Sequence, residues 1–148
     1  MVGGMLTHLY SLRRLERGNG EKIHELLEEA ENERKHLMFF MEVVQPSMLE
    51  RMLIILVQFV FWHYYLALYF FFPRLAHKTV AFFEEEAVRS YTEYLDLIDK
   101  GTIENVPAPQ IAIDYYNLLP DATLYDMIKY VRQDELHHSK VNHRYAED

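Results

Sequence analysis

Two short pairs of residues in this chain have the chemistry and the spacing to bind metal ions. They are Glu33-x-x-His36 and Glu135-x-x-His138. Residues at i and i+3 share one face of a helix, so each pair presents a carboxylate beside an imidazole. Two such helices that face each other can hold two iron or manganese ions through bridging carboxylates. One pair alone often arises by chance on an exposed helix rich in Glu and His, but two copies are stronger evidence.

A run of three acids, Glu84-Glu85-Glu86, lies between the two pairs in the sequence. A carboxylate from this segment can bridge two metals, while at least one of the three is expected to face solvent. Glu84, Ala87 and Tyr91 stand at i, i+3 and i+7, on one helical face. If Glu84 bridges the metals, Tyr91 lies about two turns further along the helix. That is close enough for electron transfer.

Each pair is preceded by a polar residue that can orient a metal-binding histidine. Asp134 precedes the second pair, and it can accept the ring N–H of a ligating imidazole. Asn32 is its counterpart before the first pair. His137 points away from the ligand face, and we expect it at the surface.

Composition restricts both the size of the protein and the kind of metal it can hold. The chain has 148 residues, enough for a single domain, and a net charge of −8, which argues against nucleic acid as a partner. It contains no cysteine, so disulfides and thiolate ligands are excluded. A metal site here must use oxygen and nitrogen ligands, which suits iron or manganese.

The hydrophobic pattern predicts an all-α protein. Gly18-Asn19-Gly20, Pro46 and Pro73 interrupt the helical periodicity. Four helices of 20 or more residues with short connections predict an antiparallel bundle, with Glu33 and His36 in its interior. The expected helical segments are 5–16, 21–44, 52–72, 74–98, 110–117 and 123–143.

Residues 52–72 contain no Asp, Glu, Lys or Arg. Their length permits a membrane-spanning helix, but Gln58, His63 and several Tyr weaken that interpretation. The alternatives are a helix lying in one leaflet and a buried core helix. A chain this small cannot bury a helix that is apolar on every side, so we favour a monotopic membrane helix. Arg74, His77 and Lys78 then supply a basic edge for anionic headgroups.

The chain offers one ligand fewer than a symmetric di-iron site requires. Such a site uses four carboxylates and two histidines, and Glu33, His36, Glu84, Glu135 and His138 make five. Segment 52–72 has no acid, and no other segment supplies the remaining carboxylate in a suitable place.

The sequence resembles the alternative oxidases over essentially its whole length. The segments that carry this resemblance are Asn32-Glu33-Arg34-Lys35-His36-Leu37, Phe83-Glu84-Glu85-Glu86-Ala87, Arg132-Gln133-Asp134-Glu135-Leu136-His137-His138, 103–109 and 112–116. The resemblance implies a ferritin-like di-iron four-helix bundle and a cyanide-insensitive, non-proton-pumping ubiquinol oxidase that reduces O₂ to water. It also implies a dimer, monotopic on the matrix face of the inner mitochondrial membrane.

The resemblance also implies roles for individual residues. Two irons would be bound by the five ligands named above, with Asn32 and Asp134 orienting them. Tyr91 would be the redox-active tyrosine beside the irons. The quinol pocket would be lined by Phe83, Glu86, Ala87 and Ser90, and the dimer interface would contain His8, Leu12 and Arg13.

Several features depart from the family pattern. Neither the family's first ligand motif, a Leu-Glu-Thr on an upstream helix, nor its first membrane helix occurs in the sequence. We therefore expect residues 1–148 to be one di-iron oxidase domain that lacks these parts, with Met1 an internal methionine. Lys35 and Tyr116 replace a Met and a Trp that are usual in the family.

Three alternatives remain open at this stage. The first is that the chain is a catalytically inactive fragment of such an oxidase. The second is that it belongs to a plastoquinol oxidase or a membrane di-iron hydroxylase. A ferritin-like iron store is a weaker idea, because the long apolar segment argues against it.

Overall fold

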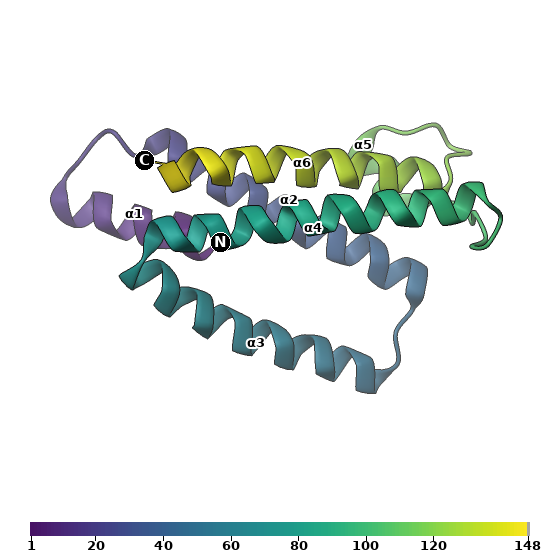
Figure 1. The fold of residues 1–148 in the computed structure, drawn as a ribbon, viewed down its shortest axis with the longest axis horizontal. Helices are drawn as coiled ribbons and strands as arrows, with labels where there is room; N and C mark the ends of the chain where they lie inside the picture. Colours follow the sequence, from purple (N-terminus) through teal and green to yellow (C-terminus); the bar gives the residue numbers. More distant parts are fainter. Residues whose placement is uncertain (148) are drawn as a thin grey trace.

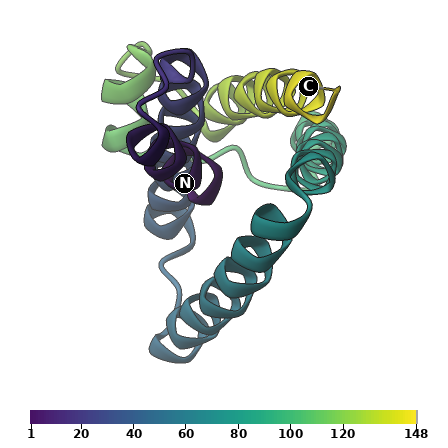
Figure 2. The same cartoon turned by 90° about the vertical axis from the view of Figure 1, so that its left-hand side faces the viewer.

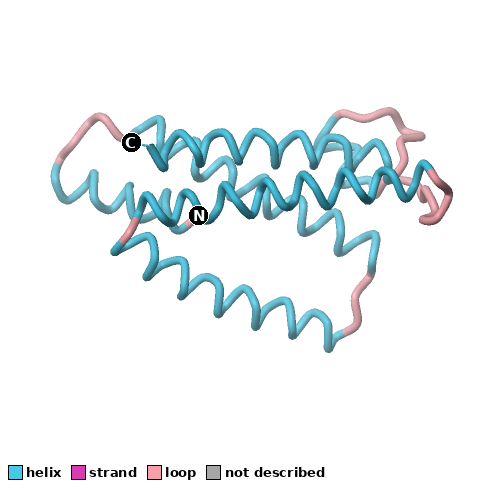
Figure 3. The backbone as a smooth tube through the Cα atoms, in the orientation of Figure 1, coloured by secondary structure: helices cyan, strands magenta, loops and turns pink. Residues whose placement is uncertain are grey.

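The computed structural model describes residues 1–147 and contains helices joined by turns and loops (Figure 3). Within these residues there is no β-strand, and one isolated antiparallel bridge joins Pro107 and Thr123. The helices are α1 (Val2–Arg14), α2 (Gly20–Val44), α3 (Met48–Phe71), α4 (Pro73–Asp99), α5 (Gln110–Tyr116) and α6 (Leu124–Glu147). The predicted all-α class is confirmed.

Local sequence determines where the helices begin and end. Helix α2 ends in a left-handed residue, Gln45, immediately before Pro46, because proline disfavours helical geometry in the residue before it. Helix α3 begins with a capping box, in which Ser47 and Glu50 satisfy each other's free backbone N–H groups. Helix α4 begins at Pro73, whose fixed φ suits the first helical position.

Helices α4 and α6 run side by side (Figures 1 and 2), and side-chain hydrogen bonds such as those from Asn32 to Asp134 and from Asn142 to Glu29 join α2 to α6. The short helix α5 contacts both α2 and α6. The main hydrophobic core lies between these four helices, towards the α5 end, and Phe39, Met127, Ile128 and Val131 are fully buried in it. This core fixes the positions of the helices that carry the candidate metal ligands.

Helix α3 departs from the other long helices along most of its length (Figures 1 and 2). It packs on α4 and α1, and Tyr69 is its one buried residue. Gly3 allows α1 to approach closely there, since a Cβ at this position would lie 2.9 Å from the Tyr69 ring. The four predicted long helices are present as α2, α3, α4 and α6. Because α3 departs from the other three, the four-helix bundle itself stays a prediction.

The outer surface of α3 is apolar and exposed. Leu53, Leu56, Val57 and Val60 are all more than half exposed, and none of them lines the cavity described below. By length and composition α3 is the one helix in residues 1–147 that could cross a membrane. The structure excludes one of the three alternatives for this segment, because α3 is not a buried core helix.

We expect Phe39→Ala to lower the free energy of unfolding by about 3–5 kcal/mol. Phe39 is fully buried, and its ring contacts His36, Tyr115 and Tyr116. Urea denaturation followed by circular dichroism measures the change. Phe82→Ala is the matched control, because Phe82 is 55% exposed, and an equal loss in both variants would contradict this account of the core.

Candidate metal centre

Helix α2 carries the first Glu-x-x-His pair. His36 is buried at 3% exposure, but the Glu33 side chain is 46% exposed. The prediction that both residues are interior was therefore right for His36 and wrong for Glu33. The reason is a large cavity beside this part of α2, which Glu33 lines.

Helix α6 carries the second pair, and both of its side chains are buried. Each histidine turns its Nδ1 atom towards the carboxylates. His138 Nδ1 lies 3.0 Å from a Glu33 oxygen and 3.7 Å from a Glu135 oxygen. His36 Nδ1 lies 3.2 Å from a Glu135 oxygen and 3.7 Å from a Glu33 oxygen. The two pairs thus interlock across the contact between α2 and α6.

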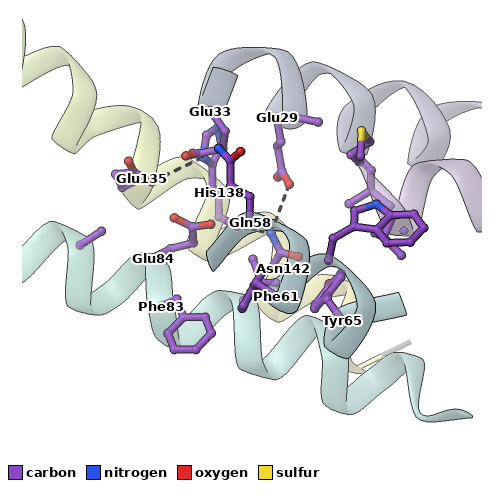
Figure 4. Close-up of a pocket in the computed structure, with 18 of the residues that line it drawn as sticks. Glu29, Glu33, Gln58, Phe61, Tyr65, Phe83, Glu84, Glu135, His138 and Asn142 are labelled. Carbon is purple, nitrogen blue, oxygen red and sulfur yellow. Dashed lines mark hydrogen bonds and ion pairs between the residues drawn. The ribbon is translucent and has the colours of Figure 1, made fainter. Parts of the chain in front are cut away.

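Helix α4 adds Glu84 to this group (Figure 4). One ligand atom from each of Glu33, Glu84, Glu135 and His138 lies within 4.8 Å of the others. The other two acids of the run lie elsewhere, since Glu85 pairs with His143 at 2.7 Å and Glu86 pairs with Arg89. Only Glu84 of the three faces the candidate centre.

Two buried nitrogen atoms show that this arrangement fits a metal. His36 Nδ1 and His138 Nδ1 are inaccessible to solvent, yet neither has a partner in hydrogen-bond geometry. A buried polar atom without a partner is costly. Both atoms point at carboxylates around one centre, so a cation bound there would satisfy them. Oxygen and imidazole donors together suit iron or manganese.

In the metal-free protein, three of the candidate ligands are protonated at neutral pH. Burial lowers the pKa of His36, but the carboxylates of Asp134 and Glu135 outweigh burial and raise the pKa to about 9. For His138, the carboxylates of Glu135 and Glu33 outweigh burial and raise the pKa to about 10. Burial and the neighbouring Glu135 raise the pKa of Glu84 well above its usual range. At neutral pH all three groups therefore hold a proton.

Asp134 and the residues around it fix the orientation of His36. Its Oδ2 atom lies 3.2 Å from His36 Nε2, 2.7 Å from the Tyr116 hydroxyl and 2.8 Å from Asn32 Nδ2, and both of these groups donate to it. When a metal displaces the Nδ1 proton, Nε2–H still donates to Asp134, and His36 then presents the lone pair of Nδ1 to the centre. The sequence predicted a role of this kind for Asp134. It did not identify Tyr116, because the partner lies on α5.

Asn32 does not occupy the position expected of a counterpart to Asp134. Its amide donates to Asp134 and to the Tyr115 hydroxyl, and no hydrogen bond joins it to His138 within residues 1–147. Asn32 therefore positions the Asp134 carboxylate, which in turn orients His36. His137 is exposed, as expected for a surface histidine.

A cavity of about 950 Å³ adjoins the candidate centre. It is lined by residues of α1, α2, α3, α4 and α6, including Glu33, Glu84, Glu135 and His138. Phe83, Ala87 and Tyr91 are on its wall, whereas Glu86 and Ser90 are not among the lining residues. The Ser90 hydroxyl instead donates to the Glu86 carbonyl oxygen on α4. The cavity thus contains two of the four residues expected to contact quinol.

Glu29 is a carboxylate on this cavity wall that the sequence analysis missed. It lies one helical turn before Glu33, and its Oε1 atom is buried without a partner. Asn142 Nδ2 donates to the other oxygen at 3.2 Å. Burial raises the pKa of Glu29 to about 7. The spacing of four residues from Glu33 was the available signal.

Comparison of the sequence with known proteins identifies its family. A family model described as alternative oxidase matches residues 1–147. The chain belongs to the alternative oxidase family.

Three curated relatives of this family are named ubiquinol oxidase and mitochondrial. The chain is 59% identical over 143 residues to one from Mangifera indica, which covers 97% of the chain and 45% of that relative. It is 58% identical over 148 residues to ubiquinol oxidase 1c of Arabidopsis thaliana, covering 100% and 44%. It is 58% identical over 143 residues to ubiquinol oxidase 2 of Nicotiana tabacum, covering 97% and 48%. The chain spans less than half the length of each relative.

Metal binding is expected to release protons and to strengthen as pH rises. His36, His138 and Glu84 each hold a proton at neutral pH, and a metal must displace it. The apparent affinity for Mn²⁺ should therefore increase between about pH 6 and 8, with up to about three protons released as the site fills. Calorimetry in buffers with different ionisation enthalpies counts these protons, and an affinity independent of pH would contradict the assignment.

Asp134→Asn is expected to weaken metal binding by about 10–100-fold, because the variant no longer holds His36 through a charged acceptor. Metal titration of the purified variant measures the effect. The matched control is Asp114→Asn on α5, where the carboxylate is exposed and bonds Gln110. If both variants bind metal equally well, Asp134 does not orient a ligand.

Proposed function

We propose that this chain is the metal-binding part of a non-proton-pumping ubiquinol oxidase, which oxidises ubiquinol and reduces O₂ to water. The observation that carries the proposal is the meeting of Glu33, Glu84, Glu135 and His138 around one centre beside a large cavity. His36 lies outside this group of four, but its Nδ1 atom is 3.2 Å from a Glu135 oxygen. A structural ion-pair network does not need a cavity at its side. A redox enzyme needs one for its substrate.

Glu33, His36, Glu84, Glu135 and His138 are the proposed ligands of two irons. When bound, the irons supply the redox chemistry by which electrons pass from quinol to O₂. The two histidines and three carboxylates keep the site hard, which suits iron in its oxidised states. The arrangement of the unpartnered histidine nitrogens supports this assignment. The sixth ligand of a symmetric site is not assigned to a residue of this chain.

The cavity is the proposed place of quinol oxidation. Phe61, Phe83 and Ala87 give it apolar walls, and Glu84 lies at the same wall (Figure 4). Quinol oxidation releases protons, and O₂ reduction consumes them. Glu29 is suited to exchange them with the cavity, because its pKa of about 7 lets it take up and give up a proton at neutral pH.

Tyr91 is the proposed electron donor beside the irons. It lines the same cavity, and its ring stacks on Phe40 at 5.8 Å between centroids. Burial raises the pKa of Tyr91, and the carboxylates Glu135, Glu33 and Glu84 raise it further. The phenol therefore stays protonated until it is oxidised.

We further propose that the protein is monotopic on the matrix side of the inner mitochondrial membrane. The exposed apolar surface of α3 supports insertion into one leaflet, and ubiquinol would then enter the cavity beside α3. A homodimer through α1 is consistent with the exposure of His8, Leu12 and Arg13 on that helix. The relatives' names support the mitochondrial location.

A second candidate is that this chain by itself is an inactive part of such an oxidase. The five-ligand count and the coverage of less than half of each relative favour it. A plastoquinol oxidase is the other enzymatic alternative, although the three relatives cited are named for ubiquinol.

Iron-loaded protein in lipid vesicles is expected to consume O₂ when ubiquinol is supplied, and more slowly with plastoquinol. Glu135→Gln should reduce the rate to background, because it removes a buried ligand. Glu104→Gln, in the exposed loop after α4, should leave the rate unchanged. An oxygen electrode measures all three.

Iron content per chain separates the alternatives. About two irons per chain without ubiquinol-dependent O₂ uptake would contradict the proposed reaction. Iron absent from this chain, but present in one extended with the upstream segment of the mango relative, would support the inactive-part alternative.

A further inference from the structure

A line of aromatic rings leads from the cavity to the far end of α6. Tyr65 lines the cavity, and its ring stacks on that of Phe61 with 5.9 Å between the centroids (Figure 4). Its ring centroid lies 6.1 Å from that of Tyr69, which lies 5.2 Å from His77. His77 in turn lies 5.5 Å from Tyr145. No step exceeds 6.1 Å, and Tyr69, His77 and Tyr145 are all buried. The prediction that His77 belongs to a basic edge was therefore wrong, because its side chain lies inside the protein between Tyr69 and Asn142.

The Tyr69 hydroxyl is bonded to a base. Asn142 Nδ2 donates to the His138 carbonyl at 3.0 Å and to Glu29, so its Oδ1 faces His77 as an acceptor. His77 Nδ1 must then carry the proton, and its Nε2 lone pair accepts the Tyr69 O–H at 3.2 Å. The tautomer of His77 is therefore fixed by the same asparagine that bonds the backbone of His138.

The Tyr145 hydroxyl is hydrogen-bonded to a second base, the Glu25 carboxylate, and its O–H is the donor. Burial raises the pKa of Glu25, but the hydrogen bonds from Tyr145 and Arg144 outweigh burial and lower it. Glu25 is thus an ionised acceptor for the Tyr145 proton. Both tyrosines have a group ready to accept the proton that a phenol loses on oxidation.

Tyr91 differs from both, since no hydrogen bond joins its hydroxyl to another group within residues 1–147. A phenol is oxidised most easily when its proton passes to a base as the electron leaves, because otherwise a strongly acidic radical cation is formed. A tyrosyl radical should therefore form more readily at Tyr69 and Tyr145, whose hydroxyls are hydrogen-bonded to bases, than at Tyr91 or Tyr65.

We propose that Tyr65, Tyr69, His77 and Tyr145 form an electron-transfer path that carries an oxidising equivalent from the cavity to the end of the helices. The path rests on the proposed function for its natural oxidant, a one-electron oxidant at the metal centre after reaction with O₂. It acts when no quinol is bound, and it protects the ligands from oxidation.

The steps balance in electrons and protons. Tyr69 gives one electron through Tyr65 to the oxidant and its phenolic proton to His77 Nε2, which leaves a neutral tyrosyl radical. Tyr145 then gives one electron to the Tyr69 radical and its proton to Glu25, while His77 returns the first proton to Tyr69. The net result is an oxidant reduced by one electron, a Tyr145 radical and a protonated Glu25.

The test uses metal-free protein and a photo-oxidant in the cavity. The sequence contains no cysteine, so Val80→Cys, on the cavity wall, gives one thiol for a ruthenium polypyridyl label. Tyr91→Phe is included to remove a competing donor. After a flash with a sacrificial acceptor, we expect a tyrosyl radical detected by electron paramagnetic resonance and faster recovery of the label than in the Tyr69→Phe variant.

Single substitutions locate the radical. Tyr145→Phe should leave a radical at Tyr69 that decays faster, and Tyr69→Phe should abolish the Tyr145 radical. His77→Phe keeps a ring but removes the base, and it should abolish both radicals. Tyr130→Phe is the matched control on α6, because Tyr130 is exposed and lies outside the path.

A radical signal and a label recovery that are unchanged by both Tyr69→Phe and Tyr145→Phe would overturn the proposal. Circular dichroism checks that each variant folds, and if His77→Phe does not fold, the conservative Tyr69→Phe variant decides the result. Because no metal is present, failure of the path leaves the proposed oxidase reaction standing. A chain that binds no iron leaves the path testable.

Discussion

Three carboxylates and two imidazoles meet at one place between α2, α4 and α6, and much of the structure depends on how their charges are balanced. Glu84 and Glu135 are drawn together from different helices, and two ionised carboxylates in contact repel each other strongly at low dielectric. Without a cation, protons on Glu84, His36 and His138 relieve this repulsion. A bound cation would relieve the same repulsion between the carboxylates, and the ligand atoms would then bind the cation in place of protons.

The groups around the centre hold its geometry through contacts between helices. Asp134, Tyr116 and Asn32 form one network, which fixes His36 from the α5 side. Asn142 is the centre of a second network that bonds Glu29, His77 and the backbone of His138. Each of the two candidate histidine ligands is thereby tied to groups that lie far apart in the sequence. Rigid support of this kind is what a metal site needs to keep its ligands in register.

Helix α3 has a different relation to the rest of the molecule. It closes one side of the cavity with Phe61 and Tyr65 while its outer surface remains apolar and exposed. A helix with a cavity on one side and an exposed apolar surface on the other would suit a lipid-soluble substrate. The same helix carries Tyr65 and Tyr69, so the proposed electron path begins where quinol would bind.

The sequence by itself determined the helices and the identity of all five candidate ligands. Breaks at Pro46 and Pro73 predict helix ends because proline disturbs helical backbone geometry locally. The pairing of Glu33 with His36 follows from helical periodicity alone. These features depend on residues a few positions apart, which is why a sequence can reveal them.

Only the tertiary structure decided which side chains from different helices meet. It selected Glu84 over its two acidic neighbours, gave Tyr116 its bond to Asp134, and left Glu33 open to a cavity. It also joined Tyr69, His77 and Tyr145 into one line of contacts. Such contacts depend on how each helix is rotated about its axis and where it crosses its neighbours. Packing of the whole core sets both quantities, and no local pattern in the sequence records them.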